Sequence, residues 1–113
     1  MSLYALMEEA QAAVAALGIR CVLSPNQLNP PCVLIGAPND ITSAGALTGG
    51  GLMCRIPLEV IATGQAENQL EWLLNTVELI HDALPVTAAS QLVYRLSDGR
   101  ELPTYTLTLE GNT

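Results

Sequence analysis

The chain has 113 residues, of which half are hydrophobic, with one Trp, three Tyr and no Phe. This length suits a single domain, residues 1–113, whose core must be built from Leu, Val, Ile and Ala. Eleven acids, four arginines and no lysine give a formal net charge of −7, which argues against tight nucleic-acid binding because such binding depends on neutralising phosphates with Lys and Arg.

Membrane insertion, secretion, disulfides and metal binding are not indicated. No apolar run approaches the roughly 18 residues that a membrane span needs, and the N-terminus lacks a basic segment before an apolar one. Cys21, Cys32 and Cys54 are odd in number and lack CxxC spacing, which argues against a disulfide framework or a zinc site. We therefore expect buried free thiols, no bound metal and no cofactor.

The first half of the chain predicts one helix and two strands. Apolar residues at helical spacing and many alanines predict a helix over Ser2–Leu17, and Gly18 can end it in a left-handed conformation. A short strand, Ile19–Leu23, leads into the turn-rich connection Ser24–Pro31. The next strand, Cys32–Gly36, is apolar on both faces, so we expect it in the interior of a sheet.

The middle of the chain predicts a long loop and a long strand. Ala37–Gly51 has no stable period, and a loop of about 15 residues in a small domain is usually functional or disordered. Leu52–Ala62 alternates as a half-buried strand does. Pro57 lacks a backbone donor, which suggests an edge position or a bulge there.

The longest helical pattern covers Gln65–Leu84, and Pro85 ends it. One face is apolar and is expected to cover the sheet: Ala66, Leu70, Leu73, Val77, Ile80 and Leu84. Trp72 and Leu79, seven residues apart, form a second apolar strip. A third set of side chains is acidic and spans about 60° of arc: Glu67, Glu71, Glu78 and Asp82.

Two further strands, Gln91–Leu96 and Tyr105–Leu109, flank the turn signal Asp98-Gly99. The predicted order is therefore α-β-β-β-α-β-β. This order predicts an α+β domain, with a mostly antiparallel sheet of about five strands and two helices against one face.

No set of catalytic residues is complete. Without lysine the chain has no P-loop and no Schiff base, and the sole histidine, His81, excludes a multi-histidine metal site. A pair of His81 with Cys21 or Cys54 is formally open, but His81 lies near the end of a helix, where a contact with the helix dipole is the commoner role. We expect no enzyme. The acidic stripe has two interpretations, a solvated face or a surface that lines something or docks a basic partner.

A family resemblance accompanies this order of elements. It rests on the N-terminal helix and on four further segments: PPCVLIGAPND at Pro30–Asp40, LMCRIPLEVIA at Leu52–Ala62, HDALPV at His81–Val86 and LPTYTLTLE at Leu102–Glu110. In these segments the chain resembles tail terminator (tail completion) proteins of long-tailed bacteriophages, of the type encoded by phages of actinobacteria.

The resemblance implies a structural role in the virion, with assembly in the host cytoplasm. Such proteins form a hexameric ring that caps the tube of the major tail protein, stops its polymerisation and meets the head-side connector or stopper protein. DNA passes through the ring without specific binding, and an acidic lining would keep it from adhering. We assign the ring contacts to six residues and the channel or docking surface to the acidic stripe. The six are Trp72, Leu79, Asp40, Gly49, Gly50 and Gly51.

Other functions stay open at this point. Another head-tail connector or neck protein of the same particle would have a similar size and shape. A small ligand- or peptide-binding module would use the sheet face and would be a monomer or dimer. A cysteine-dependent enzyme would need His81 beside a thiol.

Overall fold

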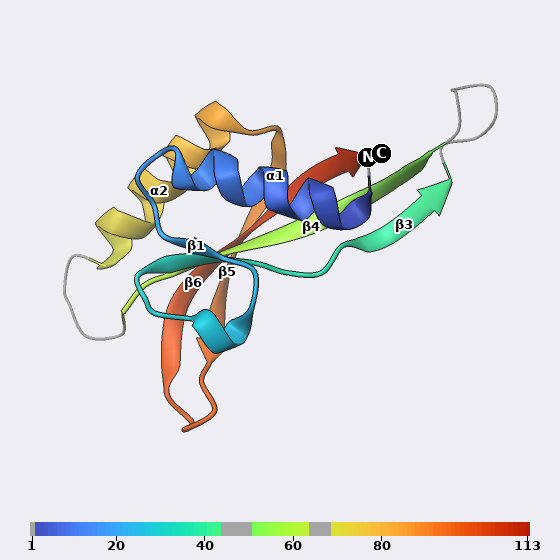
Figure 1. Cartoon of the computed structure of the whole chain (residues 1–113). Coiled ribbons are helices and arrows are strands. Elements are labelled where there is room, and N and C mark those ends of the chain that lie inside the picture. The colour runs from blue at the N-terminus through green and yellow to red at the C-terminus, as the bar shows by residue number, and fades with distance from the viewer. Residues whose placement is uncertain (1, 44–50, 64–68) are drawn as a thin grey trace.

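The computed structural model of the chain describes residues 2–43, 51–63 and 69–113. Within these residues, two α-helices lie on one side of a six-stranded sheet (Figure 1). Neither described helix is long and apolar enough to cross a membrane. The elements in chain order are α1 Leu3–Ala15, β1 Cys21–Val22, the 3-10 helix η1 Pro25–Gln27, β2 Cys32–Ile35, β3 Asn39–Ser43, β4 Leu52–Ile61, α2 Gln69–Ala83, β5 Val86–Arg95 and β6 Glu101–Asn112.

The strands of the sheet follow the order β1-β2-β4-β6-β5, and β3 pairs with β4 on the side where β2 also lies. β1 and β2 are parallel, and the other described pairings are antiparallel. The predicted α+β class, the mostly antiparallel sheet and the order of the predicted elements are confirmed.

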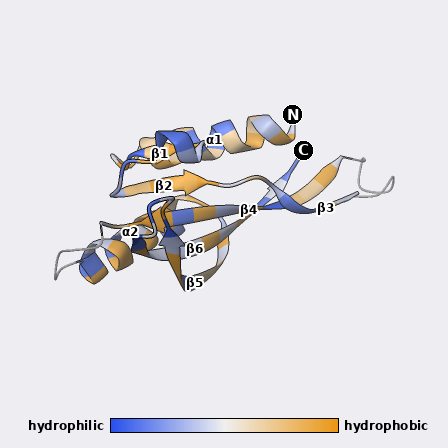
Figure 2. Cartoon of the chain, turned by 90° about the horizontal axis from the view of Figure 1, so that it is seen from below, coloured by the Kyte–Doolittle hydropathy of each residue, from blue (hydrophilic) through white to orange (hydrophobic). Residues whose placement is uncertain are grey.

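Local sequence signals set the limits of α1 and the place of β2. The Ser2 hydroxyl accepts a hydrogen bond from the Ala5 amide at 3.0 Å, which caps the helix. Gly18 has a φ of 82°, the left-handed conformation expected after the helix end. β2 is a continuous hydrophobic run (Figure 2), and it lies between β1 and β4 as its two apolar faces predicted.

The main core lies between the helices and the sheet. It joins side chains of α1 and α2 with alternate residues of β4, among them Ile56, Leu58 and Val60, each 0% exposed. A smaller cluster of Val22, Leu34, Ile61 and Leu102 lies on the opposite face of the sheet. Alternation along β4 therefore fills both clusters, because successive side chains of a strand point to opposite faces.

The residue pattern alone missed several strand residues: β6 extends beyond the predicted strand to include residues 101–104 and 110–112, and two further stretches were also missed. β3 lies inside 37–51, which was predicted to be a loop, and all five of its residues are exposed. β5 begins at Val86 rather than at Gln91, so the stretch from Val86 to Ser90 extends the predicted strand. Neither stretch has a hydrophobic period; each is a strand because a longer neighbour, β4 or β6, offers it a backbone ladder.

The buried face of α2 is turned relative to the prediction. Leu73 and Ile80 are buried, but Leu70 is 52% exposed and Thr76 takes its place against the core. Thr76 lies three residues after Leu73 and four before Ile80, so these three share one face. Ala66 belongs to the stretch outside the described residues.

Pro57 lies where β4 changes partners, and not at the edge of the sheet. β2 pairs with β4 as far as Leu58, and β3 begins its pairing opposite Arg55. The Pro57 carbonyl accepts a hydrogen bond from the Gly36 amide at 2.9 Å. The amide and the carbonyl of a strand residue point to the same neighbouring strand. The amide hydrogen that Pro57 lacks would therefore point to the gap between β2 and β3, where no ladder bond is lost.

Gly36 leaves room for the ring of Pro57. A Cβ placed at residue 36 would lie 2.8 Å from the Cγ of Pro57. We expect Gly36→Ala to lower the free energy of unfolding by about 1–3 kcal/mol through overpacking, as measured by chemical denaturation. The double variant with Pro57→Ala should recover most of this loss; equal losses with and without the proline would contradict the steric explanation.

Candidate interaction surfaces

The outer surface of the helices is acidic. Glu71, Glu78 and Asp82 are exposed on α2, as predicted for one face of that helix, and Glu67 lies outside the described residues. Glu8 and Glu9 are exposed on α1. All four arginines lie outside the two helices. We call this surface, formed by Glu8, Glu9, Glu71, Glu78 and Asp82, the acidic helix layer.

Three of the four arginines have carboxylate partners, on the strands or in the turn between β5 and β6. The ion pairs are Arg55–Asp40 at 3.5 Å, Arg95–Glu101 at 2.8 Å and Arg100–Asp98 at 2.8 Å. All six side chains are largely exposed, so each pair stabilises the fold by at most about 1 kcal/mol. Their main effect is on the charge distribution, because the strands are close to neutral while the helices stay negative.

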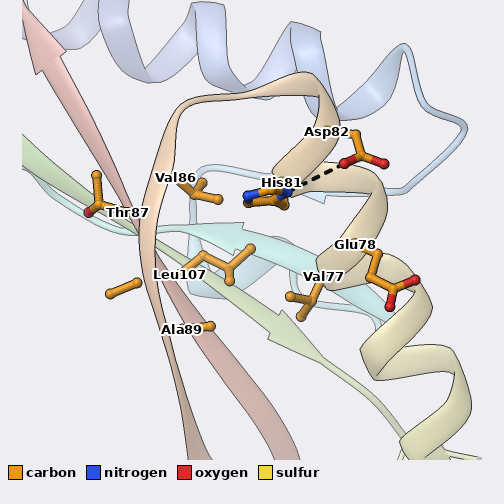
Figure 3. A pocket seen from close by; sticks show the side chains of 9 residues that line it. Val77, Glu78, His81, Asp82, Val86, Thr87, Ala89 and Leu107 are labelled. Carbon is orange, nitrogen blue, oxygen red and sulfur yellow. Dashed lines mark hydrogen bonds and ion pairs between the residues drawn. The ribbon is translucent and has the colours of Figure 1, made fainter.

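A shallow groove of about 400 Å³ separates the end of α2 from the start of β5 (Figure 3). Val77, Val86 and Leu107 form its apolar floor. His81, Glu78 and Asp82 border it on the helix side, and His81 Nδ1 lies 3.3 Å from Asp82 Oδ1. Both of these side chains are exposed, so the contact contributes little to stability.

The thiols lie away from this groove. Cys32 and Cys54 are buried, and Cys21 is partly exposed at the start of β1. Burial raises the pKa of Cys21 to about 12, with a smaller contribution from Cys32, and burial also raises the pKa of Cys32. Within the described residues, the side chains that border the groove with His81 include no cysteine, so the structure does not assemble the Cys–His pair.

Trp72 and Leu79 do not form one exposed strip. Trp72 is half-buried and packs against the main core, whereas Leu79 is 49% exposed. Helical geometry puts both on the flank of α2 that faces away from β5, since Val77 and His81 are on the flank toward β5. Of this pair, Leu79 is the side chain with surface left for a partner.

Asp40 and Gly51 lie on the segment formed by β3 and residues 51–55, which we call the arm. The end of β6 pairs with residues 53–55 on the side away from β3. Asp40 has a φ of 51° and pairs with Arg55 across the arm. Gly51 has a φ of 91°, and a Cβ there would lie 2.7 Å from the Thr113 carbonyl oxygen, so this position requires glycine. Gly49 and Gly50 lie outside the described residues.

The C-terminus is hydrogen-bonded to the far end of the arm, at Leu52. The Leu52 amide donates to Thr113 Oγ1 at 2.7 Å, and the Thr113 amide donates to the Leu52 carbonyl at 2.9 Å. The arm nevertheless leaves apolar side chains uncovered: Ile41, Leu52 and Met53 are 48%, 37% and 48% exposed. The arm reaches past the end of the helices (Figure 1).

Residue patterns missed two features of these surfaces. Leu92 and Val93 on β5 are both exposed, at 52% and 59%. Their signal is in the sequence, since adjacent apolar residues in a strand point to opposite faces and an edge strand can bury only one of them well. Glu59 is half-buried on the sheet face opposite the helices, where burial raises the pKa of its carboxyl.

Glu59 lies opposite Leu34 on β2 and Thr106 on β6. The Thr106 hydroxyl is buried and has no hydrogen-bond partner within the described residues. The ionised Glu59 carboxylate therefore lies in poorly solvated surroundings, which disfavour its charged form.

Comparisons of the chain with protein-family models and with curated proteins find no match.

The high pKa of Cys21 predicts a slow thiol. Because only the thiolate is nucleophilic, a pKa of about 12 in place of 9.0 lowers the reactive fraction at pH 8 by about a thousand-fold. We expect iodoacetamide to modify Cys21 in the folded protein at least about a hundred-fold more slowly than in urea, as followed by mass spectrometry. Modification at the rate of the unfolded chain would contradict the raised pKa, and a faster rate would show an activated thiol, as in an enzyme.

Glu59 should lower stability at neutral pH. Its pKa in the folded state is above the unfolded value, so the folded state holds its proton to higher pH and stability falls as the pH rises through that interval. Glu59→Gln should therefore raise Tm at pH 7 and have little effect near pH 3, where both states are protonated. Glu110→Gln, a change at an exposed strand position, is the matched control. A lower Tm for Glu59→Gln at pH 7 would refute the desolvation argument.

Proposed function

We propose that this protein is a structural component of a bacteriophage virion, a tail terminator that forms a hexameric ring on the end of the tail tube. The ring ends polymerisation of the tube and joins the tail to the head-side connector, and DNA passes through its opening. The resemblance of the residue segments and of the element order to tail terminators motivates this proposal, and the surfaces described above support self-assembly.

The observation that carries the proposal is the uncovered apolar arm. Ile41, Leu52 and Met53 expose apolar area on a projection that no described element of the same chain covers. A chain that must stay dispersed as a monomer usually protects such a projection with charge or a covering element. Association of copies would bury this surface, as a ring requires.

The acidic helix layer supports passage of DNA beside the protein. Its five acids have no arginine on the same helices to balance them, so this surface repels a phosphate backbone. Repulsion of this kind suits a channel through which DNA slides without adhering. A basic docking partner would make use of the same charges, and the two uses differ in whether the layer faces the channel.

Another neck protein of the same particle is the closest alternative, because it would share self-assembly and charge. The groove between α2 and β5 favours a second alternative, a small ligand- or peptide-binding module. The alternatives differ in what the protein binds: the tube end, the connector, or a small partner held by a monomer.

Assembly on tail tubes tests the proposal. Six copies of the 11.9 kDa chain form a ring of about 71 kDa, which light scattering after size exclusion should detect in the free protein or on tube ends. In an assembly reaction with the major tail protein, adding the purified protein should yield shorter tubes, each with a ring at one end in electron micrographs.

The same reaction with heat-denatured protein is the control. Tubes that elongate unchanged in the presence of the folded protein would refute the terminator role. Binding to the purified connector alone, with no effect on tubes, would assign the protein to another position in the neck.

A further inference from the structure

β5 is an unprotected sheet edge. Its ten residues are paired with β6 on one side only, and nearly all of them are exposed. From Val86 to Tyr94 the strand carries no charge and no proline, the two devices that most often prevent edge pairing. The opposite edge is protected differently: β1 has two residues, and Pro25 follows soon after it.

An apolar helix flank lies beside this edge. Leu70, Leu74 and Val77 follow one another at spacings of four and three, so they share one flank of α2. Val77 borders the groove to β5, which places this flank on the β5 side. We call the combined area, formed by Leu70, Leu74 and Val77 of α2 and by Ala89, Leu92 and Val93 of the β5 edge, the receiving surface. Val93 points to the same sheet face as α2, and Leu92 points to the opposite face, where Tyr94 packs with the smaller cluster.

The arm and the receiving surface are separated across the width of the sheet. β3 pairs with β4 on the side of β2, whereas β5 lies beyond β6 at the other end of the strand order. Figure 1 shows the arm projecting away from α2. One chain therefore cannot fold its own arm onto its own receiving surface without breaking the pairing of β4.

We propose that the arm of one copy packs on the receiving surface of the next copy, with β3 beside β5. This inference rests on the proposed ring and names its contacts. A contact between two different surfaces of the same chain is head-to-tail, and it closes into a ring when the rotation between copies divides a full turn. A symmetric pairing of two β5 edges would leave both arms uncovered, so the head-to-tail contact accounts for more of the exposed apolar area.

Charge is compatible with this contact. Arg55 on the arm is the cation nearest to its apolar residues, and Glu78 and Asp82 border the receiving surface. Asp40 offsets part of this attraction, so apolar burial is the main driving force. The other acids of the helix layer, Glu8, Glu9 and Glu71, do not border the groove to β5.

A mixing experiment tests the direction of the contact. The edge variant carries Leu92→Lys and Val93→Lys, and the arm variant carries Ile41→Lys and Met53→Lys; all four positions are exposed, so both variants should fold. The control variant carries Tyr4→Lys and Ala12→Lys on α1, which adds the same charge at exposed positions elsewhere. Circular dichroism and thermal melts confirm folding before assembly is measured.

Each interface variant alone should be monomeric where the wild type and the control assemble. An equimolar mixture of the two should form dimers and nothing larger, since only the arm of the edge variant and the edge of the arm variant are intact. Native mass spectrometry resolves these species and identifies one copy of each variant in the dimer.

The other outcomes overturn the inference in distinguishable ways. An edge variant that is monomeric beside an arm variant that still assembles would show symmetric β5 pairing. Rings formed by both variants would place the contacts elsewhere and leave the proposed ring standing. A wild type that is monomeric in solution and on tube ends would refute the ring together with this contact. The variant mixture could form dimers although the wild type leaves tube length unchanged in the assembly reaction. That result would support the contact and refute the role as tail terminator.

Discussion

The architecture depends on the pairing of β4. One side of β4 forms a continuous ladder with β6, while the other side pairs first with β3 and then, past Pro57, with β2. Its second half buries side chains under the helices, and burial of each such aliphatic side chain contributes about 1.5–3 kcal/mol. Its first half extends beyond the helices and supports the arm. A single strand therefore provides both the centre of the core and the base of the surface proposed for assembly.

The uncovered apolar area follows from this geometry. α1, with 13 residues, packs over β1 and β2, and α2, with 15 residues, packs over β4, β6 and β5. The arm projects from the start of β4, and β5 forms one edge of the sheet; each exposes aliphatic side chains. The chain has no Phe, the large side chain that could cover such areas from within the same copy. The exposed apolar surface is therefore available to another copy.

Charge and apolar exposure occupy different parts of the molecule. The acids gather on the outer face of the helices, and the arm and the β5 edge carry mostly uncharged side chains. This separation matters for the proposed assembly, because copies with a net charge of −7 repel one another where their acids meet. In the proposed ring it would also leave most of the acidic helix layer exposed, as the proposed passage of DNA requires.

The sequence by itself determined which segments have a helical or strand period, the order of those elements, the exposure of Glu71, Glu78 and Asp82, and the left-handed conformation of Gly18 after α1. These depend on neighbours a few residues apart. Only the tertiary structure decided that β3 and the start of β5 are strands, since both lack a period and depend on distant partners for their ladders. It likewise turned α2 so that Thr76 is buried and Leu70 exposed, and it separated Trp72 from Leu79. The rotation of a helix and the position of a sheet edge are set by packing between residues far apart in the chain, and a local pattern cannot contain that information.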